Sequence, residues 1–314
     1  MVLPFCMGRG ICYAGDMNIL VLGGGKGSEC EVSLRSSAEV QRALVELGHE
    51  VQFADPSSGD AAVRQAARNC DMVFPILHGQ GGEDGVVQQL LEDIGKPYLG
   101  SDVAVSRLCF DKVQLKEVLV AHGILTPRSQ VVTAQTFAQS ELVKCAFVLK
   151  PVADGSSVGT MIVRDLPYDS QRASQLLATY GKMLLEELIV GVEVTVPVLD
   201  EVALPVIEIV PPLGKDFDYE NKYNGATTEL CPPHNVSLKL QEQAQRLAEQ
   251  VHHFSGARHL SRTDMMIDAE GRIYVLEINT MPGMTTQSLF PKSAAAAGMP
   301  WTALVAKFVE MVLG

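Results

Sequence analysis

The segment Arg262-Thr-Asp-Met-Met-Ile-Asp-Ala-Glu-Gly-Arg-Ile-Tyr-Val-Leu-Glu-Ile-Asn279 has the pattern of a β-hairpin. Two runs rich in apolar residues flank a short polar turn, Asp268–Gly271, which ends in a glycine. Pairing Ile267 with Arg272 across this turn gives the register that we expect for the two strands. The segment therefore predicts an antiparallel pair in the C-terminal part of the chain.

The second strand of this hairpin is expected to have one polar and one apolar face. Side chains alternate between the two faces of a β-strand. In this strand Val275, Glu277 and Asn279 would share one face, while Leu276 and Ile278 would point into a core. The polar face then offers oxygen atoms from two functional side chains.

Two carboxylates converge on that face in the expected register. Arg262 lies opposite Glu277, and Asp264 lies opposite Val275, so that Asp264 is a diagonal neighbour of Glu277. Carboxylates this close repel unless a cation lies between them, and their oxygens, with the amide of Asn279, suit magnesium or manganese. A solvated polar face with a chance Arg–Glu ion pair is the alternative interpretation.

The N-terminal part of the chain alternates strands with a helix. Residues 18–22 form a short apolar run that predicts a buried strand, and the following helix ends at Leu47, before Gly48. Further strands are expected at 51–54 and 71–76. This alternation indicates an α/β subdomain with a parallel sheet.

Gly23-Gly-Gly25-Lys-Gly27 resembles part of a dinucleotide-binding fingerprint but fails it. The third glycine of that fingerprint would fall at Ser28, so Asp55 is not assigned as a ribose ligand. The loop does place Glu29 near a helix start, where the helix dipole stabilises a carboxylate.

A glycine-rich loop lies between two predicted strands in the middle of the chain. The strands are 147–150 and 160–163, and the loop contains Gly155-Ser-Ser-Val-Gly159. Backbone N–H groups of such a loop can approach phosphate closely, and Lys150 could supply charge. No helix follows the loop, so it is not a Walker A motif. A flexible surface hairpin is the alternative.

Three further segments carry candidate functional groups. His78 opens a glycine-dense loop, ending at Gly85, at the carboxyl end of the third strand, where α/β proteins bind ligands. Carboxylates at 186, 187 and 193 could accept hydrogen bonds from a nucleotide or form a solvated acidic patch. Lys222-Tyr223 lies in a long irregular segment, 211–233, which follows a predicted strand and precedes a predicted amphipathic helix.

The composition restricts the class of protein. The 314 residues carry a net charge of −12, which argues against DNA or RNA as a partner. No apolar run reaches the length of a membrane-spanning helix, so we expect no membrane insertion. The seven cysteines contain no CxxC pair, which favours reduced thiols in a cytoplasm. Residues 1–16 precede a further methionine, Met17, and are expected to be a dispensable extension.

Taken together, these segments resemble the D-alanine–D-alanine ligases of the ATP-grasp superfamily. The similar stretches follow the family's order from Met17 to the C-terminal end. They are Glu29-Cys-Glu-Val-Ser-Leu34, His78 to Gly85 with Gln88 and Leu91-Glu92, Lys96-Pro-Tyr-Leu-Gly-Ser101, Asp111-Lys112, Lys150-Pro151, Gly155 to Gly159, Glu186 to Glu193, Asp218-Tyr-Glu-Asn-Lys-Tyr223, Arg262-Thr-Asp264, Glu277-Ile-Asn-Thr-Met-Pro-Gly-Met-Thr285 and Ser288-Leu289. One departure is that residues 224–230 contain no aromatic side chain where the family often has one.

The resemblance implies an α/β chain with α+β subdomains in the ATP-grasp arrangement. Residues 17–101 would form an N-terminal parallel-sheet subdomain that binds substrate. Residues 102–186 would form a central lid subdomain with the glycine-rich phosphate loop, and residues 187–314 a C-terminal mixed-sheet subdomain with the metal site and a lid loop. Residues 1–16 lie outside this scheme.

The resemblance also assigns residues to ATP and to metal. Asp264, Glu277 and Asn279 would hold two magnesium or manganese ions that bridge the ATP phosphates. The residues expected at the phosphates are Lys112, Lys150, Ser156, Ser157, Val158 and Lys222. The carboxylates expected at adenine and ribose are Glu186, Glu187 and Glu193.

A third set of residues is assigned to D-alanine by the same resemblance. Glu29 would hold the ammonium of the first D-alanine, with His78 nearby. Arg262 and the Gly283 backbone would stabilise the oxyanion, and Ser288 with Leu289 would bind the second D-alanine. Ser156 and Tyr223 would link to Glu29 and close the lid.

The activity implied is ATP-dependent formation of D-alanyl-D-alanine for peptidoglycan synthesis in a bacterial cytoplasm. Two alternatives remain open at this stage: a related ligase that takes D-lactate or D-serine as second substrate, and a nucleotide-binding regulator without catalysis. A homodimer is compatible with the sequence, which does not decide the oligomeric state.

Overall fold

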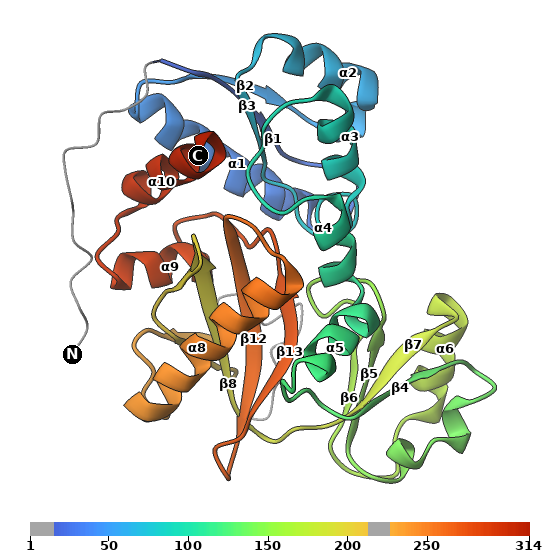
Figure 1. The fold of residues 1–314 in the computed structure, drawn as a ribbon. Helices are drawn as coiled ribbons and strands as arrows, with labels where there is room; N and C mark the ends of the chain where they lie inside the picture. Colours follow the sequence, from blue (N-terminus) through green and yellow to red (C-terminus); the bar gives the residue numbers. More distant parts are fainter. Residues whose placement is uncertain (1–15, 213–226) are drawn as a thin grey trace.

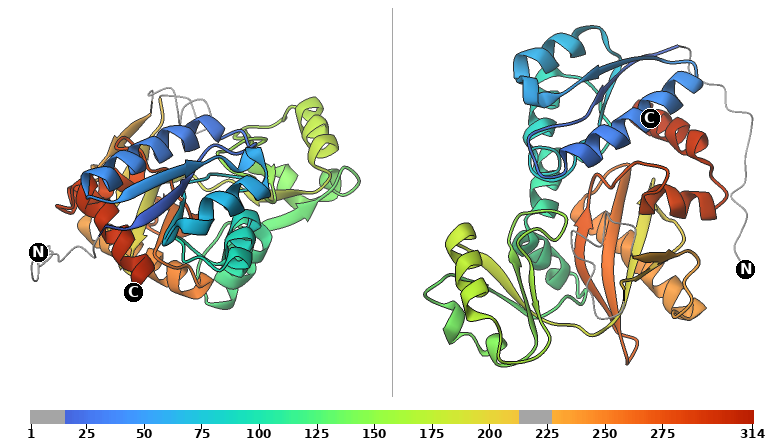
Figure 2. Two further views of the ribbon diagram at one scale, coloured as in Figure 1. Left: turned by 90° about the horizontal axis from the view of Figure 1, so that it is seen from above. Right: turned by 180° about the vertical axis from the view of Figure 1, so that it is seen from behind.

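The computed structural model describes residues 16–212 and 227–314, which contain three β-sheets with helices packed around them (Figure 1). The expected α/β character with α+β subdomains is confirmed, because one sheet is parallel and two are antiparallel. Figure 2 shows the same layers from above and from behind.

The N-terminal sheet is parallel and has β1 at its centre. Its strands are β1 (Asn18–Leu22), β2 (Glu50–Ala54) and β3 (Met72–Pro75), in the order β2-β1-β3. Alternate β1 side chains enter different cores: Ile19 and Val21 pack with α1 and α10, whereas Leu20 and Leu22 pack with α2 and α3. The helices around it are α1 (Cys30–Glu46), α2 (Asp60–Ala66), α3 (Val86–Ile94) and α10 (Trp301–Leu313).

The central sheet is antiparallel and carries the glycine-rich loop. Its strands are β4 (Ser129–Val132), β5 (Phe147–Pro151), β6 (Met161–Val163) and β7 (Met183–Glu187), in the order β4-β7-β5-β6. Helix α6 (Ser170–Tyr180) packs on the sheet through Ala173 and Leu177. The predicted order of strand, loop and strand is confirmed by the pairing of β5 with β6.

The C-terminal sheet has six strands and holds the predicted hairpin. Its order is β11-β10-β8-β12-β13, with β9 paired to β8. The strands are β8 (Gly191–Leu199), β9 (Val202–Ala203), β10 (Ile207–Val210), β11 (Thr228–Leu230), β12 (Leu260–Asp268) and β13 (Ile273–Asn279). Helices α4 (Val103–Phe110), α5 (Lys112–Ala121) and α8 (Leu238–Ser255) share its core, and α9 (Leu289–Ala296) precedes α10. Short 3₁₀ turns lie at Pro56–Ser58, Ala67–Asn69, Phe137–Gln139 and Glu141–Lys144.

The register of the hairpin differs from the prediction in two places. The backbone N–H of Asp268 donates to the carbonyl of Arg272 at 3.0 Å, so Ile267 pairs with Ile273 instead of Arg272. The Asp268 side chain fixes this turn, since its Oδ1 accepts from the Arg272 N–H at 2.8 Å. A β-bulge then adds Leu276 to the second strand.

The bulge changes which side chains reach the polar face. Asp264 lies directly opposite Glu277, and Arg262 lies opposite Asn279. Val275 is buried in the core, whereas Leu276 lines a cavity beside Glu277. The expected burial of Leu276, and the expected position of Val275 beside the carboxylates, were therefore wrong.

Helix α10 packs the C-terminal end of the chain onto the N-terminal sheet and α1. It packs against α1, so that Phe308 shares a core with Ile19 of the N-terminal sheet (Figure 1). No single helix in the described part of the chain is long and apolar enough to cross a membrane, and the one pair that reaches this length together, α9 and α10, is bent by 103°. The division into subdomains at 102 and 187 stays a prediction.

Candidate active site

Two cavities lie side by side between the three sheets. The inner cavity, about 730 Å³, is reached by α1, the loop after β3 and the segment 279–292, and the outer cavity, about 410 Å³, lies between the central and C-terminal sheets. Both sizes are typical of small-molecule sites. Lys112, Asp154, Gly155 and Glu277 line both cavities, so these residues form their common boundary.

The cavities separate the predicted residues into two groups. The inner cavity is lined by Glu29, His78, Ser156, Arg262, Asn279, Gly283, Ser288 and Leu289. The outer cavity is lined by Lys150, Ser157, Val158, Glu186, Glu187, Glu193 and Asp264. The described residues assigned to D-alanine therefore all line the inner cavity, and most of those assigned to the nucleotide and the metal line the outer cavity. Ser156 and Asn279 are the exceptions, because they line the inner cavity although they were expected at phosphate and metal. Lys222 and Tyr223 lie outside the described residues.

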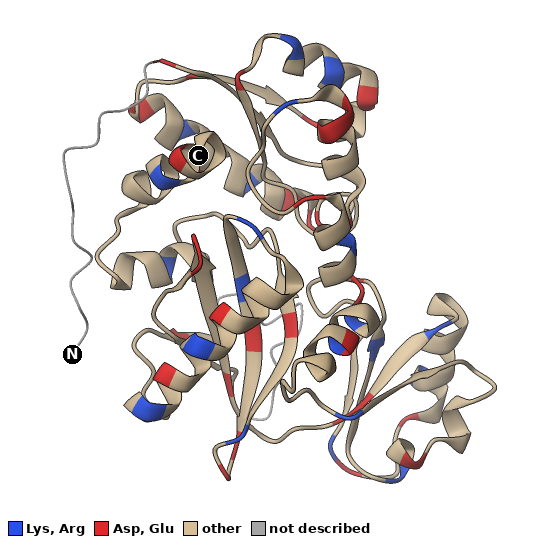
Figure 3. Cartoon of the chain, in the orientation of Figure 1, with Lys and Arg blue, Asp and Glu red and all other residues tan. Residues whose placement is uncertain are grey.

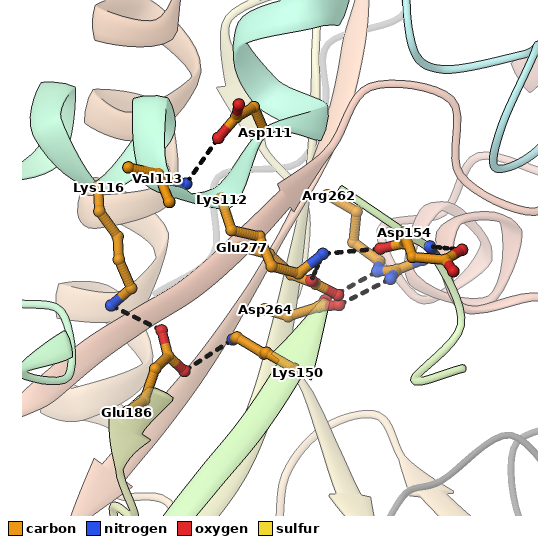
Figure 4. A network of polar contacts seen from close by, with 11 residues as sticks. Asp111, Lys112, Val113, Lys116, Lys150, Asp154, Glu186, Arg262, Asp264 and Glu277 are labelled. Atoms are coloured by element: carbon orange, nitrogen blue, oxygen red, sulfur yellow. Dashed lines mark hydrogen bonds and ion pairs between the residues drawn. The ribbon is translucent and has the colours of Figure 1, made fainter. Parts of the chain in front are cut away.

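The paired carboxylates of the hairpin each face a cation. Arg262 donates from Nε and Nη2 to the two carboxylate oxygens of Asp264, at 2.9 and 2.8 Å. Lys112 Nζ lies 3.3 Å from Glu277 Oε2 (Figure 4). Thr195 Oγ1 donates to Asp264 at 2.5 Å. The sheet thus concentrates both signs of charge where β12, β13 and α5 meet (Figure 3).

These residues fit a divalent cation. Within the described residues no cluster of three or more His, Cys, Asp or Glu side chains suits a metal ion. Asp264 and Glu277 are nevertheless direct neighbours across the ladder, and Asn279 Oδ1, which accepts from the Met281 N–H at 2.9 Å, keeps a second lone pair. Two carboxylates and an amide oxygen leave the remaining positions to water and phosphate, as magnesium prefers.

A buried chain of lysine and glutamate supports the outer cavity. Lys116 Nζ contacts Glu186 Oε1 at 2.8 Å, and Lys150 Nζ contacts Glu186 Oε2 at 2.7 Å (Figure 4). Lys116 also donates to Thr126 Oγ1 at 2.6 Å and to the Pro127 carbonyl at 2.8 Å. Three acceptors therefore satisfy the Lys116 ammonium.

This chain favours the charged forms of Glu186 and Lys150, but not of Lys116. Burial favours a raised pKa for Glu186, but Lys150 and Lys116 outweigh it and lower the pKa. Burial opposes the charge of Lys150, yet Glu186 and Glu277 leave its pKa raised. For Lys116, burial outweighs the attraction of Glu186 and lowers the pKa. Glu186 therefore fixes the ammonium of Lys150 at the cavity wall.

The glycine-rich loop lies over the common boundary. Lys112 anchors this loop through two hydrogen bonds. Its backbone N–H donates to the Val152 carbonyl at 3.0 Å, and its Nζ donates to the Asp154 carbonyl at 2.7 Å. Ser156 and Ser157 have φ angles of 50° and 58°, a region that side chains rarely adopt. Such strained backbone is common where a loop approaches a ligand.

Glu29 links α1 to this loop. The hydroxyl of Ser156 donates to its carboxylate, so the two meet although they are 127 residues apart. A Cβ atom at Gly79 or Gly155 would lie 2.5 or 2.7 Å from Glu29 Oε2, closer than real Cβ contacts. The two glycines, which lie next to each other, therefore let two backbone segments approach the same carboxylate oxygen closely.

His78 and Glu83 lie buried beside Glu29. His78 contacts the Met281 carbonyl through Nδ1 at 3.0 Å and Ser36 Oγ through Nε2 at 3.3 Å. Burial lowers the pKa of His78, although the charge of Glu29 opposes this. Burial raises the pKa of Glu83 to about 8, and Glu29 adds to the increase. A neutral imidazole and a neutral acid therefore surround Glu29 at neutral pH.

The segment after β13 closes the inner cavity. Ser288 Oγ accepts from the Thr285 N–H at 3.1 Å and pairs with Thr285 Oγ1 at 2.9 Å. A Cβ atom at Gly283 would lie 3.0 Å from Ser288 Oγ. The Gly283 backbone is thus held close to the Ser288 hydroxyl at the cavity wall.

Glu187, a predicted site residue, and Asp55 have partners that the sequence did not indicate. Glu187 accepts from the Arg128 backbone at 2.9 Å and from Arg128 Nε at 2.7 Å. Asp55, which the fingerprint argument set aside, accepts from the backbone of Gly25 at 2.9 Å and of Ser57 at 2.8 Å. Its oxygens thus stabilise a loop.

The sequence alone did not indicate that Glu83, Lys116 and Thr195 belong to the site. Glu83 was part of a quoted motif, so the signal was present but had no role attached. Lys116 lies four residues after Lys112, one turn along α5, and nothing local indicates its contact with Glu186. Strands β7 and β8 were not predicted either, so Thr195 had no position.

The comparisons with known proteins agree with this geometry. Residues 120–310 match the family model described as "D-ala D-ala ligase C-terminus", and residues 54–101 match "D-ala D-ala ligase N-terminus". A D-alanine–D-alanine ligase of Nitratidesulfovibrio vulgaris is 39% identical over 300 residues, covering 94% of this chain and 98% of the relative. That of Gloeobacter violaceus is 40% identical over 304 residues, covering 95% and 100%.

Solved structures show the same similarity. A D-alanine–D-alanine ligase of Bacillus anthracis complexed with ATP has a TM-score of 0.81 at 30% identity and covers 95% of this chain and 97% of its own. The VanG D-Ala:D-Ser ligase of Enterococcus faecalis has a TM-score of 0.79 at 26% identity, covering 95% and 99%. The fold and the two adjoining cavities define a ligase of the ATP-grasp class. Within that class, the chain belongs to the D-alanine–D-alanine ligase family.

Proposed function

We propose that the chain joins two D-alanine molecules into D-alanyl-D-alanine, with conversion of ATP to ADP and phosphate. The observation that carries this proposal is the common boundary of the two cavities, formed by Lys112, Asp154, Gly155 and Glu277. A nucleotide in the outer cavity and an amino acid in the inner cavity would meet there. Full-length similarity to D-alanine–D-alanine ligases supports the choice of substrate.

The first step transfers a phosphoryl group. A carboxylate oxygen of the first D-alanine attacks the γ-phosphorus, the bond to the β-γ bridging oxygen breaks, and ADP leaves D-alanyl phosphate behind. Lys112 and Lys150 bring positive charge to the transferring group, and the backbone of the loop at 155–159 covers it. Asp264, Glu277 and Asn279 would hold one or two magnesium or manganese ions, which neutralise phosphate charge when bound.

Glu29 is the proposed anion for the ammonium of the first D-alanine. It is buried, lies at the first turn of α1, and is contacted by Ser156 from the glycine-rich loop. A charged substrate ammonium would offset the cost of keeping this carboxylate away from water. The same loop therefore would touch both the phosphate and the residue that orients the amino acid.

The second step forms the peptide bond. The amine of the second D-alanine attacks the acyl carbon, and phosphate leaves after a proton is lost from nitrogen. Arg262 uses two N–H groups for Asp264, which leaves three to face the developing oxyanion together with the Gly283 backbone. Ser288 and Leu289 line the part of the cavity that would receive the second D-alanine. The product suits peptidoglycan synthesis in a bacterial cytoplasm.

A coupled assay of ADP release with D-alanine alone tests the proposal. We expect ADP and D-alanyl-D-alanine in equal amounts, with activity that depends on magnesium. ADP release that appears only after addition of D-serine or D-lactate would show that the added compound, and not D-alanine, is the second substrate. Nucleotide binding without turnover on any of the three would contradict the enzyme assignment.

A further inference from the structure

Glu83 is a buried carboxyl group that the proposed reaction does not use. It lines the inner cavity and is 7% exposed. The Gly79 N–H donates to its Oε2 at 2.6 Å, and the Glu83 backbone N–H donates to the Gly79 carbonyl at 2.9 Å. The side chain and the backbone of Glu83 thus hold the two peptide units on either side of Gly79.

The turn that Glu83 holds forms one wall of the Glu29 site. Gly79 has a φ of +65°, and a Cβ there would lie 2.5 Å from Glu29 Oε2. Gly155 packs against the same oxygen next to Gly79: a Cβ at Gly155 would lie 2.7 Å from Glu29 Oε2 and 3.6 Å from the Gly79 Cα. Because the carboxylate of Glu29 has so little space, a shift of Gly79 would displace it.

The charge of Glu83 affects Glu29 directly. Three charged groups affect the pKa of Glu83: Glu29 at the N-cap of α1, Arg262 of β12 and Glu277 of β13. The charge of Glu83 in turn raises the pKa of Cys109 on α4. Burial and the negative charge of Glu29 raise the pKa of Glu83 to about 8, against the opposing effects of Arg262 and the Gly79 hydrogen bond. Below that pH Glu83 is a neutral acid and adds no second anion beside Glu29.

We propose that Glu83 is a positioning residue for the first D-alanine, which in its neutral form holds the Gly79 turn against Glu29. Glu29 then meets the substrate ammonium in a fixed orientation. The neutral acid keeps a carbonyl oxygen for the Gly79 N–H, so its role needs no negative charge. The identity of the ligand rests on the proposed function, whereas the charge state of Glu83 does not.

Two variants separate these roles. Glu83→Gln keeps the size and the acceptor of the neutral acid, so we expect its KM for the first D-alanine to stay close to wild type at pH 7. Glu83→Ala removes the hydrogen bond and should raise that KM about tenfold, with the KM for ATP unchanged. Asp84→Asn is the matched control, because Asp84 accepts from Gly81 at 2.8 Å and Val86 at 3.1 Å in the same loop and does not line the cavity.

A measurement without substrate tests the charge state. A carboxyl group whose pKa is raised in the folded protein binds its proton more tightly there than in the unfolded chain, so folding stability falls as pH rises from the ordinary value of 4.5 to about 8. Glu83→Gln has no carboxyl proton to lose, so its folding stability does not fall for this reason. The difference in melting temperature between Glu83→Gln and wild type should therefore increase from pH 4.5 to about 8 and stay constant above that pH.

The outcomes distinguish the two proposals. A difference in melting temperature that stays constant with pH would overturn the neutral state of Glu83. A Gln variant as impaired as the Ala variant, or an Ala variant with wild-type KM for D-alanine, would overturn its positioning role. A wild-type protein that makes no dipeptide would contradict the proposed function, while the pH dependence of melting would still decide the charge of Glu83.

Discussion

Glu277 and Asp264 each face a cation of the protein itself. Lys112 lies 3.3 Å from Glu277, and Arg262 binds Asp264 through two hydrogen bonds. A metal ion held by the two carboxylates would therefore compete with contacts that already neutralise them. We therefore expect the side chains at the common boundary to exchange partners when a metal ion binds.

Replacement of Glu277 by Gln should reduce turnover at least about tenfold, because one oxygen ligand and one negative charge are lost from a site that balances cations. The fold should be retained, since Gln keeps the shape. Steady-state rates across a magnesium titration provide the measurement. Glu270→Gln, in the exposed turn of the same hairpin, is the control. Wild-type activity of Glu277→Gln at limiting magnesium would exclude Glu277 as a ligand.

Lys116 offers a test of the buried chain behind the outer cavity. Replacement by Met leaves Glu186 with Lys150 as its remaining lysine contact and should destabilise the fold by about 3–5 kcal/mol, as expected when one partner of a buried ion pair is removed. The KM for ATP should rise as well, because Glu186 loses the lysine that helps to position it beside Lys150. Urea denaturation and nucleotide titration measure both effects.

The exposed pair of Lys144 and Glu141 supplies the matched comparison. Both side chains are largely exposed, so Lys144→Met should change the free energy of unfolding by less than about 1 kcal/mol. An equal cost for the two replacements would show that the burial of Lys116 does not matter.

At the scale of elements, two departures from regular structure build the site. The bulge at Leu276 places Asp264 opposite Glu277, and it turns Leu276 toward the outer cavity. The loop at 155–159 joins two antiparallel strands and brings Ser156 to Glu29 at the start of α1. Regular strands and helices carry these features, but the irregular segments aim the side chains.

Gly155→Ala should weaken D-alanine binding without unfolding the protein. The added Cβ would lie 2.7 Å from Glu29 Oε2, so either the loop or the carboxylate must move. We expect the KM for the first D-alanine to rise about tenfold. Gly27→Ala is a suitable control, because its Cβ would meet its nearest neighbour at an ordinary 3.4 Å. Equal effects of both replacements on KM would contradict the close contact at Glu29.

At the scale of the whole molecule, the C-terminal helix α10 packs onto β1 of the N-terminal sheet. The core around α10 contains Ile19 and Val21 of β1 as well as Phe290 of α9 and Phe308 of α10. This core also contains Leu199 and Leu260 of the C-terminal sheet, so it joins the two sheets. Residues near 19 and near 308 must therefore be present together for the inner cavity to keep its shape.

Phe308→Ala should cost about 3–5 kcal/mol of folding free energy, since the side chain is fully buried and its removal leaves a cavity. Leu313→Ala on the same helix is half exposed and should cost much less. Denaturant unfolding followed by fluorescence measures both. A similar cost for both residues would show that α10 does not depend on its buried face.

The order and type of most elements could be predicted from local patterns. The period-two alternation of 262–279, the apolar run 18–22, and the helix face from Leu240 to Val251 each depend on neighbouring residues alone. The predicted register of the hairpin was wrong, because the Asp268 turn and the bulge each shift the pairing by one residue. Strands β4, β7, β8 and β9 were missed, as was β11, which lies within the segment 211–233 that was predicted to be irregular.

The sequence by itself determined which kinds of side chain the site contains, where the glycines lie, and which family the chain resembles. Only the tertiary structure decided that Glu186 lies between Lys116 and Lys150, and that Glu83 supports the turn beneath Glu29. Secondary structure depends on contacts a few residues apart, whose periods are visible in the sequence. The charge of a buried group depends on desolvation and on partners that folding brings together from distant positions, and neither leaves a local pattern.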